Sequence, residues 1–334
     1  IFAIGQLVIA LPVGKWMDRF GRRPVLLVGS LAETAALIFI GISLLAGSRL
    51  WFSFSLILLG LGSGAAQMAY LIGGDIYPPT RRAEGLGLMT TSIAIGIVAG
   101  PYLIGLISDL ANILGYDPLV FPWFCLSLLT ALASWLMYGL HPDPLQVAND
   151  LVSYFPSGHD QAGILEDNGT TPSQGLCKLL HQYPITASIG IMICFQGVRL
   201  SLVPLLTFIL TARSYSLSLS ALMVAGMGVG MVVSSSLIGQ LGDAWGRKKP
   251  LLLAILVGGL GAGLLPLVSS LVLMFILLVF LGAAFSTALT MTRVMITDVT
   301  SSRERGEAMA LNSVAIGIAV VLFPTISSYL LSLY

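Results

Sequence analysis

The residues with most chemical potential in this sequence form a charged motif that occurs twice. Residues 14–23 read GKWMDRFGRR, and residues 239–248 read GQLGDAWGRK. Each copy places a carboxylate four residues after a glycine, and a cation four residues after that carboxylate. Such groups form ion pairs and charge-assisted hydrogen bonds. Because neither copy has the spacing of a nucleophile with its base or of metal ligands, the motif predicts electrostatic contacts and no enzyme.

A second pattern follows each copy of the first. Residues 75–84 read DIYPPTRRAE and residues 298–307 read DVTSSRERGE, with an Asp, an Arg and a Glu in register without gaps. Two motifs in the same order indicate an internal repeat whose halves have parallel orientation. The residues assigned to this repeated charged cluster are Gly14, Asp18, Arg19, Gly21, Arg22, Arg23, Asp75, Arg82, Gly239, Asp243, Gly246, Arg247, Lys248, Asp298 and Arg305.

Composition shows which elements must position these motifs. The chain has 334 residues, of which 56% are hydrophobic and 9% charged, and its mean hydropathy is +0.95. Soluble domains carry about 25% charged residues, so lipid must solvate most of this chain. A net charge of +1 excludes a strong field for nucleic acid. The cysteines and histidines lack metal-ligand spacing, and we expect no metal and no cofactor apart from a proton gradient.

Apolar stretches of about 20 residues, the length that crosses a bilayer, recur along the chain. The sequence therefore predicts an all-α membrane protein with about ten transmembrane helices, in a bundle at 1–139 and a second bundle at 184–334. The polar segment 140–183 is rich in Pro, Gly and Ser and is predicted to be a flexible linker. The predicted spans are 1–14, 25–46, 50–76, 85–108, 120–139, 184–210, 216–240, 251–269, 271–297 and 306–331.

The distribution of Lys and Arg predicts the orientation. One set of alternate loops holds twelve of the sixteen cations, and the opposite set holds only Arg49 and Arg213. Cytoplasmic loops carry the excess of Lys and Arg, so we expect the basic loops and the linker on the cytoplasmic side, in a plasma membrane. The two remaining cations, Arg199 and Arg293, fall inside predicted spans.

The pattern G-x-x-x-D-R-x-G-R-R resembles the loop motif between the second and third helices of the major facilitator superfamily, and residues 239–248 are similar to its second-half copy. The resemblance covers essentially the whole chain and implies a two-bundle secondary transporter. Aligned to the twelve helices of that family, the chain holds the second to the eleventh. Because Ile1 already lies inside an apolar run, we expect a fragment or truncated product. We also expect a monomer that contacts lipid and a small-molecule substrate.

The repeat and the resemblance together predict how the charges pair. Arg22 should pair with Asp75, and Asp18 should face the start of the last span near Gly306, where backbone N–H groups favour negative charge. By the repeat, Arg247 should pair with Asp298, while Asp243 should face the span that begins near Gly85. Asp18 is expected to follow a tight turn that requires Gly14 and Gly21. We interpret these contacts as a cytoplasmic latch; the alternative is that the arginines only fix orientation.

The fourth predicted span carries a further resemblance. Its glycines and proline are spaced like the fifth-helix motif of drug:proton antiporters, including the efflux type found in fungi, and this favours export. Close approach of a neighbouring helix at Gly96 and Gly100, with a bend at Pro101, is expected; ordinary helix packing is the alternative. Leu58 stands where many of these antiporters carry an Arg, which leaves the proton-coupling residue open. The motif residues are Gly87, Gly96, Gly100, Pro101 and Gly105.

Charged residues inside the predicted spans are the candidates for contact with a substrate. A charge at the middle of a bilayer costs about 2.5–3.5 kcal/mol on insertion scales, so each needs water or a partner. Gln196 precedes Arg199 by three residues and shares its helix face; the alternative is a structural Arg. We expect Arg293 to snorkel toward the cytoplasmic surface. The candidates for substrate or coupling contacts are Arg199, Gln196, Gln67, Tyr70 and Glu33.

These observations favour a secondary active transporter that exports small organic molecules by proton-coupled alternating access. A proton-coupled uptake symporter for a nutrient is the alternative within the same fold. An inactive truncated transporter is a further alternative. A membrane receptor is disfavoured because it does not require a duplicated latch.

Overall fold

The computed structural model of the chain describes residues 1–154, 176–215 and 217–331. No strand occurs among these residues, and nine of their helical segments are long and apolar enough to cross a membrane. The all-α membrane class is therefore confirmed. The remaining predicted span, 1–14, lies in α1 (Phe2–Phe20), which carries Lys15, Asp18 and Arg19 near its end and is less apolar than the other nine.

The helices before the linker follow one another with short connections. After α1 come α2 (Arg22–Leu45), α3 (Arg49–Ala66), η1 (Gln67–Tyr70), α4 (Leu71–Ile76), η2 (Pro79–Arg81), α5 (Arg82–Leu114) and α6 (Phe121–Tyr138). The later part of the chain contains α11 (Tyr183–Ala212), α12 (Leu217–Trp245), α13 (Lys248–Leu264), η3 (Leu265–Leu267), α14 (Leu271–Asp298) and α15 (Arg305–Leu331).

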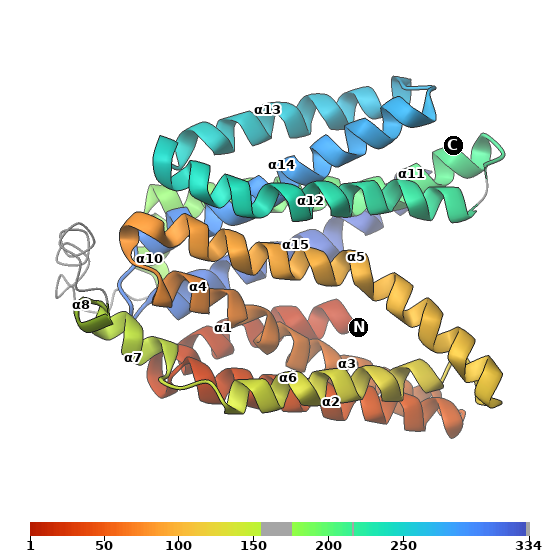
Figure 1. Cartoon of the computed structure of the whole chain (residues 1–334), viewed down its shortest axis with the longest axis horizontal. Helices are drawn as coiled ribbons and strands as arrows, with labels where there is room; N and C mark the ends of the chain where they lie inside the picture. Colours follow the sequence, from red (N-terminus) through yellow and green to blue (C-terminus); the bar gives the residue numbers. More distant parts are fainter. Residues whose placement is uncertain (155–175, 216, 332–334) are drawn as a thin grey trace.

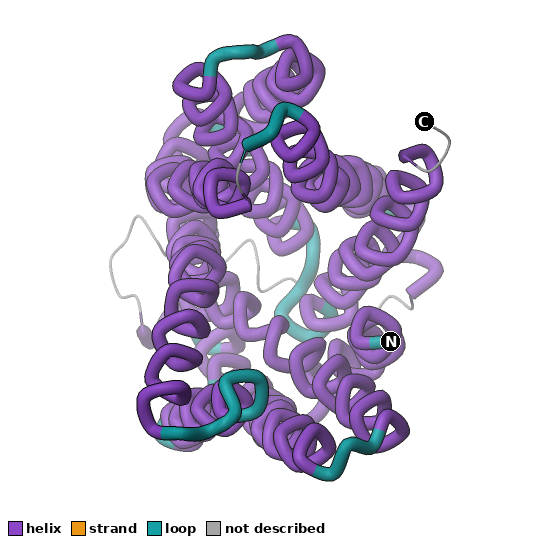
Figure 2. Tube along the Cα trace, turned by 90° about the vertical axis from the view of Figure 1, so that its right-hand side faces the viewer, coloured by secondary structure: helices purple, strands orange, loops and turns teal. Residues whose placement is uncertain are grey.

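The early and late parts of the chain pack together mainly through α5 with α12 and α1 with α15. In Figure 1, α12, α13 and α14 lie at the top and α2, α3 and α6 at the bottom, with α5 and α15 between them. The end-on view in Figure 2 shows these helices side by side along a common direction. α5 contacts α12 and α1 contacts α15, so segments far apart in the sequence form both of these inner contacts.

Glycines allow the backbones to approach closely at both crossings. A Cβ atom at Gly14 would lie 2.5 Å from the carbonyl oxygen of Gly306, and a Cβ atom at Gly239 would lie 2.5 Å from that of Ala83. Any larger side chain would separate α1 from α15 or α12 from α5. Gly14 and Gly239 are equivalent positions of the repeat, so a close backbone contact at a glycine joins the two parts of the chain at both crossings.

The turn associated with the charged motif comes after Asp18, so the prediction that Asp18 follows a tight turn is wrong. α1 continues to Phe20, and the chain reverses at Gly21 with a φ of +99°, a value that favours glycine. Gly246 takes the same role before α13, with a φ of +82°. Gly14 is required by the contact with α15 instead of by the turn.

The third predicted span is interrupted near its middle. α3 and α4 belong to one apolar span, Arg49–Ile76, and the tighter turn η1 separates them. Side chains three residues apart are eclipsed in a 3₁₀ turn, so Gln67 and Tyr70 lie on the same face. Short 3₁₀ stretches inside helices often mark functional hinges. This interruption places two polar side chains together at the level of the membrane.

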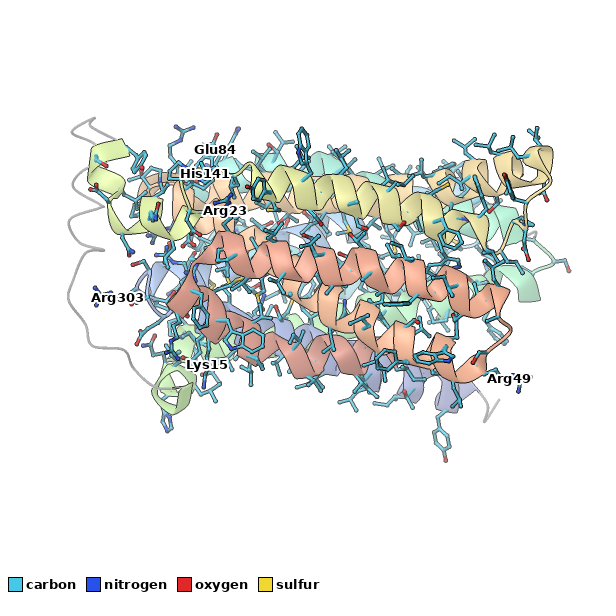
Figure 3. The ribbon with its side chains drawn as sticks, turned by 90° about the horizontal axis from the view of Figure 1, so that it is seen from below. Lys15, Arg23, Arg49, Glu84, His141 and Arg303 are labelled. Carbon is cyan, nitrogen blue, oxygen red and sulfur yellow. The ribbon has the colours of Figure 1, made fainter. Side chains whose placement is uncertain are left out.

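Charged side chains gather at one end of the helices. Figure 3 shows Lys15, Arg23, Glu84 and Arg303 at that end, whereas Arg49 lies at the opposite end. We call the first the basic end. It is the end that the distribution of Lys and Arg predicts to be cytoplasmic.

The segment predicted as a linker, 140–183, contains short helices where the structure describes it. These are α7 (Pro144–Asn149), α8 (Leu151–Tyr154) and α10 (Leu176–His181). α7 packs against α4 and α2 at the basic end. The central part of the predicted linker, 155–175, lies outside the described residues.

Candidate functional site

The two motif aspartates each bind the start of a helix from the other part of the chain. The N–H groups of Gly306 and Glu307 donate to the two carboxylate oxygens of Asp18, at 2.9 and 2.8 Å. α15 begins at Arg305, so the negative charge lies where the helix dipole and free N–H groups favour it. This contact has the geometry expected from the sequence.

The same arrangement recurs at the second copy of the motif. The N–H groups of Ala83 and Glu84 donate to the carboxylate oxygens of Asp243, at 3.2 and 2.9 Å. These residues form the first turn of α5. Both aspartates therefore bridge the early and late parts of the chain at the basic end.

Arginine side chains extend the first of these contacts into a buried network. Nε of Arg22 donates to Asp75 at 2.8 Å, and Nη2 of Arg22 donates to the carbonyl oxygen of Ser302 at 3.0 Å. Nη1 of Arg305 donates to the other carboxylate oxygen of Asp75, also at 2.8 Å. The charged groups of Arg22, Asp75 and Arg305 are fully buried. The pairing of Asp75 with Arg305 adds a bridge that the sequence reasoning missed.

The second network is similar but more exposed. Nε of Arg247 donates to Asp298 at 3.0 Å, and Nη2 of Arg247 donates to the carbonyl oxygen of Pro79 at 3.2 Å. Pro79 and Ser302 are equivalent in the repeat. The side chain of Arg247 is 19% exposed and that of Asp298 is 30% exposed. Burial lowers the pKa of Arg247, but Asp298 and Asp243 together raise it above its ordinary value, so the side chain stays charged.

The other members of the predicted cluster lie around these networks. Arg82 is buried, and its Nη1 atom lies 3.8 Å from Asp298, a looser contact than that of Arg305 with Asp75. Arg19 and Lys248 are exposed at the basic end. Arg23 is half-buried, with its guanidinium carbon 5.3 Å from the centroid of the Tyr138 ring.

Asp143 is a contributor that the sequence analysis missed. The N–H groups of Arg22 and Arg23 donate to its two carboxylate oxygens, at 3.1 and 3.0 Å, so Asp143 caps the start of α2. It also caps its own helix, since the N–H group of Leu145 donates to it at 2.8 Å. The pair Asp143–Pro144 signals only this local cap, because Pro is favoured at the first position of a helix.

A central cavity of about 400 Å³ lies between the early and late parts of the chain. The predicted residues Gln67, Tyr70, Gln196 and Arg199 all line it. Nε of Arg199 donates to the side-chain oxygen of Gln196 at 2.7 Å, which fixes both side chains. The remaining lining residues are Ala66, Ala69, Met89, Ser92, Ile93, Ile97, Met192, Phe195, Met231, Phe285, Leu289 and Arg293.

Arg293 lines this cavity, so the prediction that it snorkels to the surface is wrong. The residue is only 4% exposed, and its guanidinium carbon lies 3.7 Å from the centroid of the Tyr70 ring. Its Nε and Nη1 atoms are buried without a hydrogen-bond partner in the part of the chain that the structure describes. The repeat offers a signal: Tyr70 and Arg293 are 223 residues apart, as are Asp75 and Asp298. Arg293 is thus the counterpart of a predicted cavity residue.

Glu33 and Leu58 lie away from the central cavity. Glu33 is half-buried on α2, and its backbone nitrogen would lie 2.5 Å from a Cβ atom at Gly62 on α3. Leu58 and Gly62 line an apolar groove of about 660 Å³ between α1, α2 and α3. The predicted role of Glu33 in binding substrate therefore lacks a contact with the cavity.

Only one end of the predicted glycine motif in α5 forms a close contact. A Cβ atom at Gly87 would lie 2.6 Å from the carbonyl oxygen of Ser235 on α12. A Cβ atom at Gly96, Gly100 or Gly105 would meet no other described residue within 4 Å. The close approach expected at Gly96 and Gly100 is thus wrong within the described residues, because α5 meets α12 through another face. Pro101 lies inside α5, which turns toward α6 in its second half (Figure 1).

Comparisons with known proteins agree with this architecture. A family model described as Major Facilitator Superfamily matches residues 1–197 and 187–334. The uncharacterized MFS-type transporter YdeG of Bacillus subtilis (strain 168) is 24% identical over 328 residues, which cover 96% of this chain and 73% of YdeG. The class C tetracycline resistance protein of Escherichia coli is 32% identical over 167 residues, 46% of this chain and 39% of that protein.

The fold is also similar to that of solved structures. The proton:xylose symporter XylE bound to 6-bromo-6-deoxy-D-glucose superposes with a TM-score of 0.77. The sequence identity is 18%, and the match covers 100% of this chain and 79% of the XylE chain. At that identity the likeness concerns the arrangement of the helices.

Proposed function

The chain belongs to the Major Facilitator Superfamily, and we propose that it exports small organic molecules by proton-driven alternating access. It is a multi-pass membrane transporter and not an enzyme. Its substrate, its direction of transport and its coupling to protons are parts of the proposal.

The observation that carries the proposal is the position of the cavity relative to the charged networks. Tyr70 lines the cavity and Asp75 belongs to the buried network, five residues further along the chain. The same interval separates Arg293 from Asp298. Five residues of helix span about 7.5 Å. The charged networks thus lie at the basic end and close that side of the cavity in the proposed cycle.

Opening the basic end requires that the contacts between the two parts break. These contacts include the bonds of Asp18 to α15, of Asp243 to α5 and of Arg305 to Asp75. Once separated, charged groups and helix ends can be solvated by water, so they suit a contact that forms and breaks in each cycle. In the proposed cycle, substrate binding and protonation shift the balance between the closed and open arrangements.

Export and proton coupling are supported by separate observations. The spacing of Gly87, Gly100 and Pro101 resembles that of antiporters, and one relative is a tetracycline resistance protein. For coupling, Glu33 supplies a carboxyl group within a membrane span, and intramembrane carboxyls commonly carry protons in transporters. We propose Glu33 as the coupling group, acting at a distance from the cavity.

The test is an accumulation assay in a host that lacks its own efflux pumps. Cells expressing the chain are given a panel of labelled anionic, neutral and cationic aromatic compounds, with and without a protonophore. We expect lower accumulation of at least one compound, restored by the protonophore and absent in Asp18→Asn cells with equal membrane expression. Higher accumulation under an inward proton gradient would establish uptake instead, and no change with any compound would contradict the proposal.

A further inference from the structure

We propose that the central cavity binds organic anions, held by the guanidinium groups of Arg199 and Arg293. The inference rests on the proposed transport function and names the class of substrate. It goes beyond the repeated charged motifs, because neither arginine belongs to them.

The first argument is the charge balance of the cavity. Its lining includes two arginines and, among the described residues, no Asp or Glu. Arginine remains charged in proteins, so the cavity holds two positive charges at the level of the membrane. Elsewhere the chain pairs its buried arginines: Arg22 and Arg305 both bind Asp75. Among the described residues, no such counter-charge lies at the cavity arginines, and an anionic ligand would supply it.

The second argument is the geometry of Arg293. The ring of Tyr70 covers one face of the guanidinium group, at 3.7 Å from its central carbon. Guanidinium N–H bonds lie in the plane of the group, so stacking leaves them free to donate at its edge. Nε and Nη1 are buried and make no hydrogen bond to any residue that the structure describes. Arg293 therefore holds two unsatisfied donors, and each can make a charge-assisted hydrogen bond to an anionic group such as a carboxylate or phosphate.

Arg199 supplies a second donor group whose orientation is fixed by Gln196. Nε of Arg199 donates to the Gln196 side chain at 2.7 Å, which uses one donor of the guanidinium group. The amide of Gln196 carries no charge, so it orients the cation without neutralising it. Because Arg199 is on α11 and Arg293 on α14, a ligand that binds both would link two helices of the late part of the chain.

The rest of the cavity wall indicates what the anion should carry. Met89, Ile93, Phe195, Phe285 and Leu289 present apolar and aromatic surface. A volume of about 400 Å³ falls in the range of small-molecule sites. The cavity thus suits a compact molecule with an aromatic or aliphatic body and one anionic group. A free inorganic anion would leave most of this wall unused.

The experiment measures binding to the purified full chain in lipid nanodiscs. Three probes share one ring system and differ in charge: 2-naphthoate, 2-naphthamide and 2-naphthylmethylammonium. We expect 2-naphthoate to bind at least tenfold more tightly than the other two. R199Q and R293Q should each weaken its binding about tenfold, the effect of one charge-assisted hydrogen bond. Arg49→Gln, an exposed arginine at the opposite end, should leave binding unchanged.

The comparison of the three probes on the unaltered protein needs no variant, so a folding defect cannot hide the answer. Equal or tighter binding of the amide or the ammonium would overturn the inference, even if the accumulation assay shows proton-driven export of those compounds. Conversely, arginine-dependent binding of 2-naphthoate, with no movement of any compound in the accumulation assay, would establish the anion site and remove the transport proposal. R293K should keep part of the affinity that R293Q loses, since it keeps the charge.

Discussion

Arg293 lies over the ring of Tyr70, and the two residues occupy the same position in the two halves of the repeat. The first half contributes the aromatic ring of Tyr70 and the second half the cation of Arg293, so the two equivalent positions form a cation–π contact with each other. A desolvated cation–π contact contributes about 2 kcal/mol, which offsets only part of the cost of a buried guanidinium group. The contact therefore holds Arg293 in place while leaving its charge available.

Variants of Tyr70 test this relationship. Tyr70→Phe keeps the ring and removes the hydroxyl, which lies 3.0 Å from the hydroxyl of Ser313. Tyr70→Leu removes the aromatic face. We expect Tyr70→Phe to keep most of the affinity for 2-naphthoate and Tyr70→Leu to lose about tenfold or more, because Arg293 is then no longer oriented. Equal affinities of the two variants would show that the ring does not position Arg293.

The two networks at the basic end should differ in their contribution to stability. Asp75→Asn removes the buried carboxylate that Arg22 and Arg305 share, so that Arg22 keeps only its pair with Asp18, and it should lower the free energy of unfolding by about 3–5 kcal/mol. Asp298→Asn acts on a partly exposed pair and should cost about 1 kcal/mol or less. Thermal unfolding in detergent measures both variants, which are matched in chemistry and in repeat position. Similar losses would contradict the difference in burial as the cause.

Asp18→Asn should distinguish a latch, which must form and break during transport, from the alternative in which the basic residues only fix the orientation of the chain in the membrane. The amide loses the negative charge that faces the start of α15 and Arg22, so the closed arrangement is weakened while the basic loops keep their cations. We expect normal membrane expression, a clear loss of transport, and faster labelling of a cysteine placed at Gln67 from the cytoplasmic side. Full transport with unchanged labelling would remove the latch interpretation.

Two glycine substitutions should have opposite effects. Gly14→Ala places a Cβ atom 2.5 Å from a backbone oxygen of α15, so the helices must separate and the melting temperature should fall. Gly100→Ala places a Cβ atom where no described residue lies within 4 Å. It should be neutral or raise stability by up to about 1 kcal/mol, since alanine favours helix. A destabilising Gly100→Ala would mean that another helix covers that face.

The sequence predicts most of this arrangement because the repeat carries positional information. The repeated spacing of the charged residues predicts the partners of Asp18, Arg22 and Arg247, because a charged side chain at the edge of the membrane needs an ion pair or a hydrogen bond. The repeat also predicts that Arg293 lies at the cavity, because it is the counterpart of Tyr70. Its position near the end of the predicted span 271–297 instead favours an interpretation in which it reaches the cytoplasmic surface. Which face of α14 turns inward is set by packing against neighbouring helices, and the local pattern does not determine it.

Other features depend on tertiary contacts that have no local signal. Asp143 reaches the start of α2 across the fold, whereas its neighbours in sequence indicate only a cap for its own helix. Small residues such as Gly96 and Gly100 permit a close approach without specifying which helix makes it. These are cases in which the residue type allows an interaction and the fold decides whether it forms.

The 3₁₀ turn at Gln67–Tyr70 gives the short helix α4 a mechanical role. Tyr70 ends that turn, and Asp75 lies one residue before the end of α4. The single short helix α4 therefore connects the ring of Tyr70, at the cavity, to the carboxylate of Asp75, which Arg22 and Arg305 share. Because so short a segment joins them, any shift of the ring on ligand binding would be felt at the carboxylate that Arg305 binds, which links occupancy of the cavity to closure of the basic end.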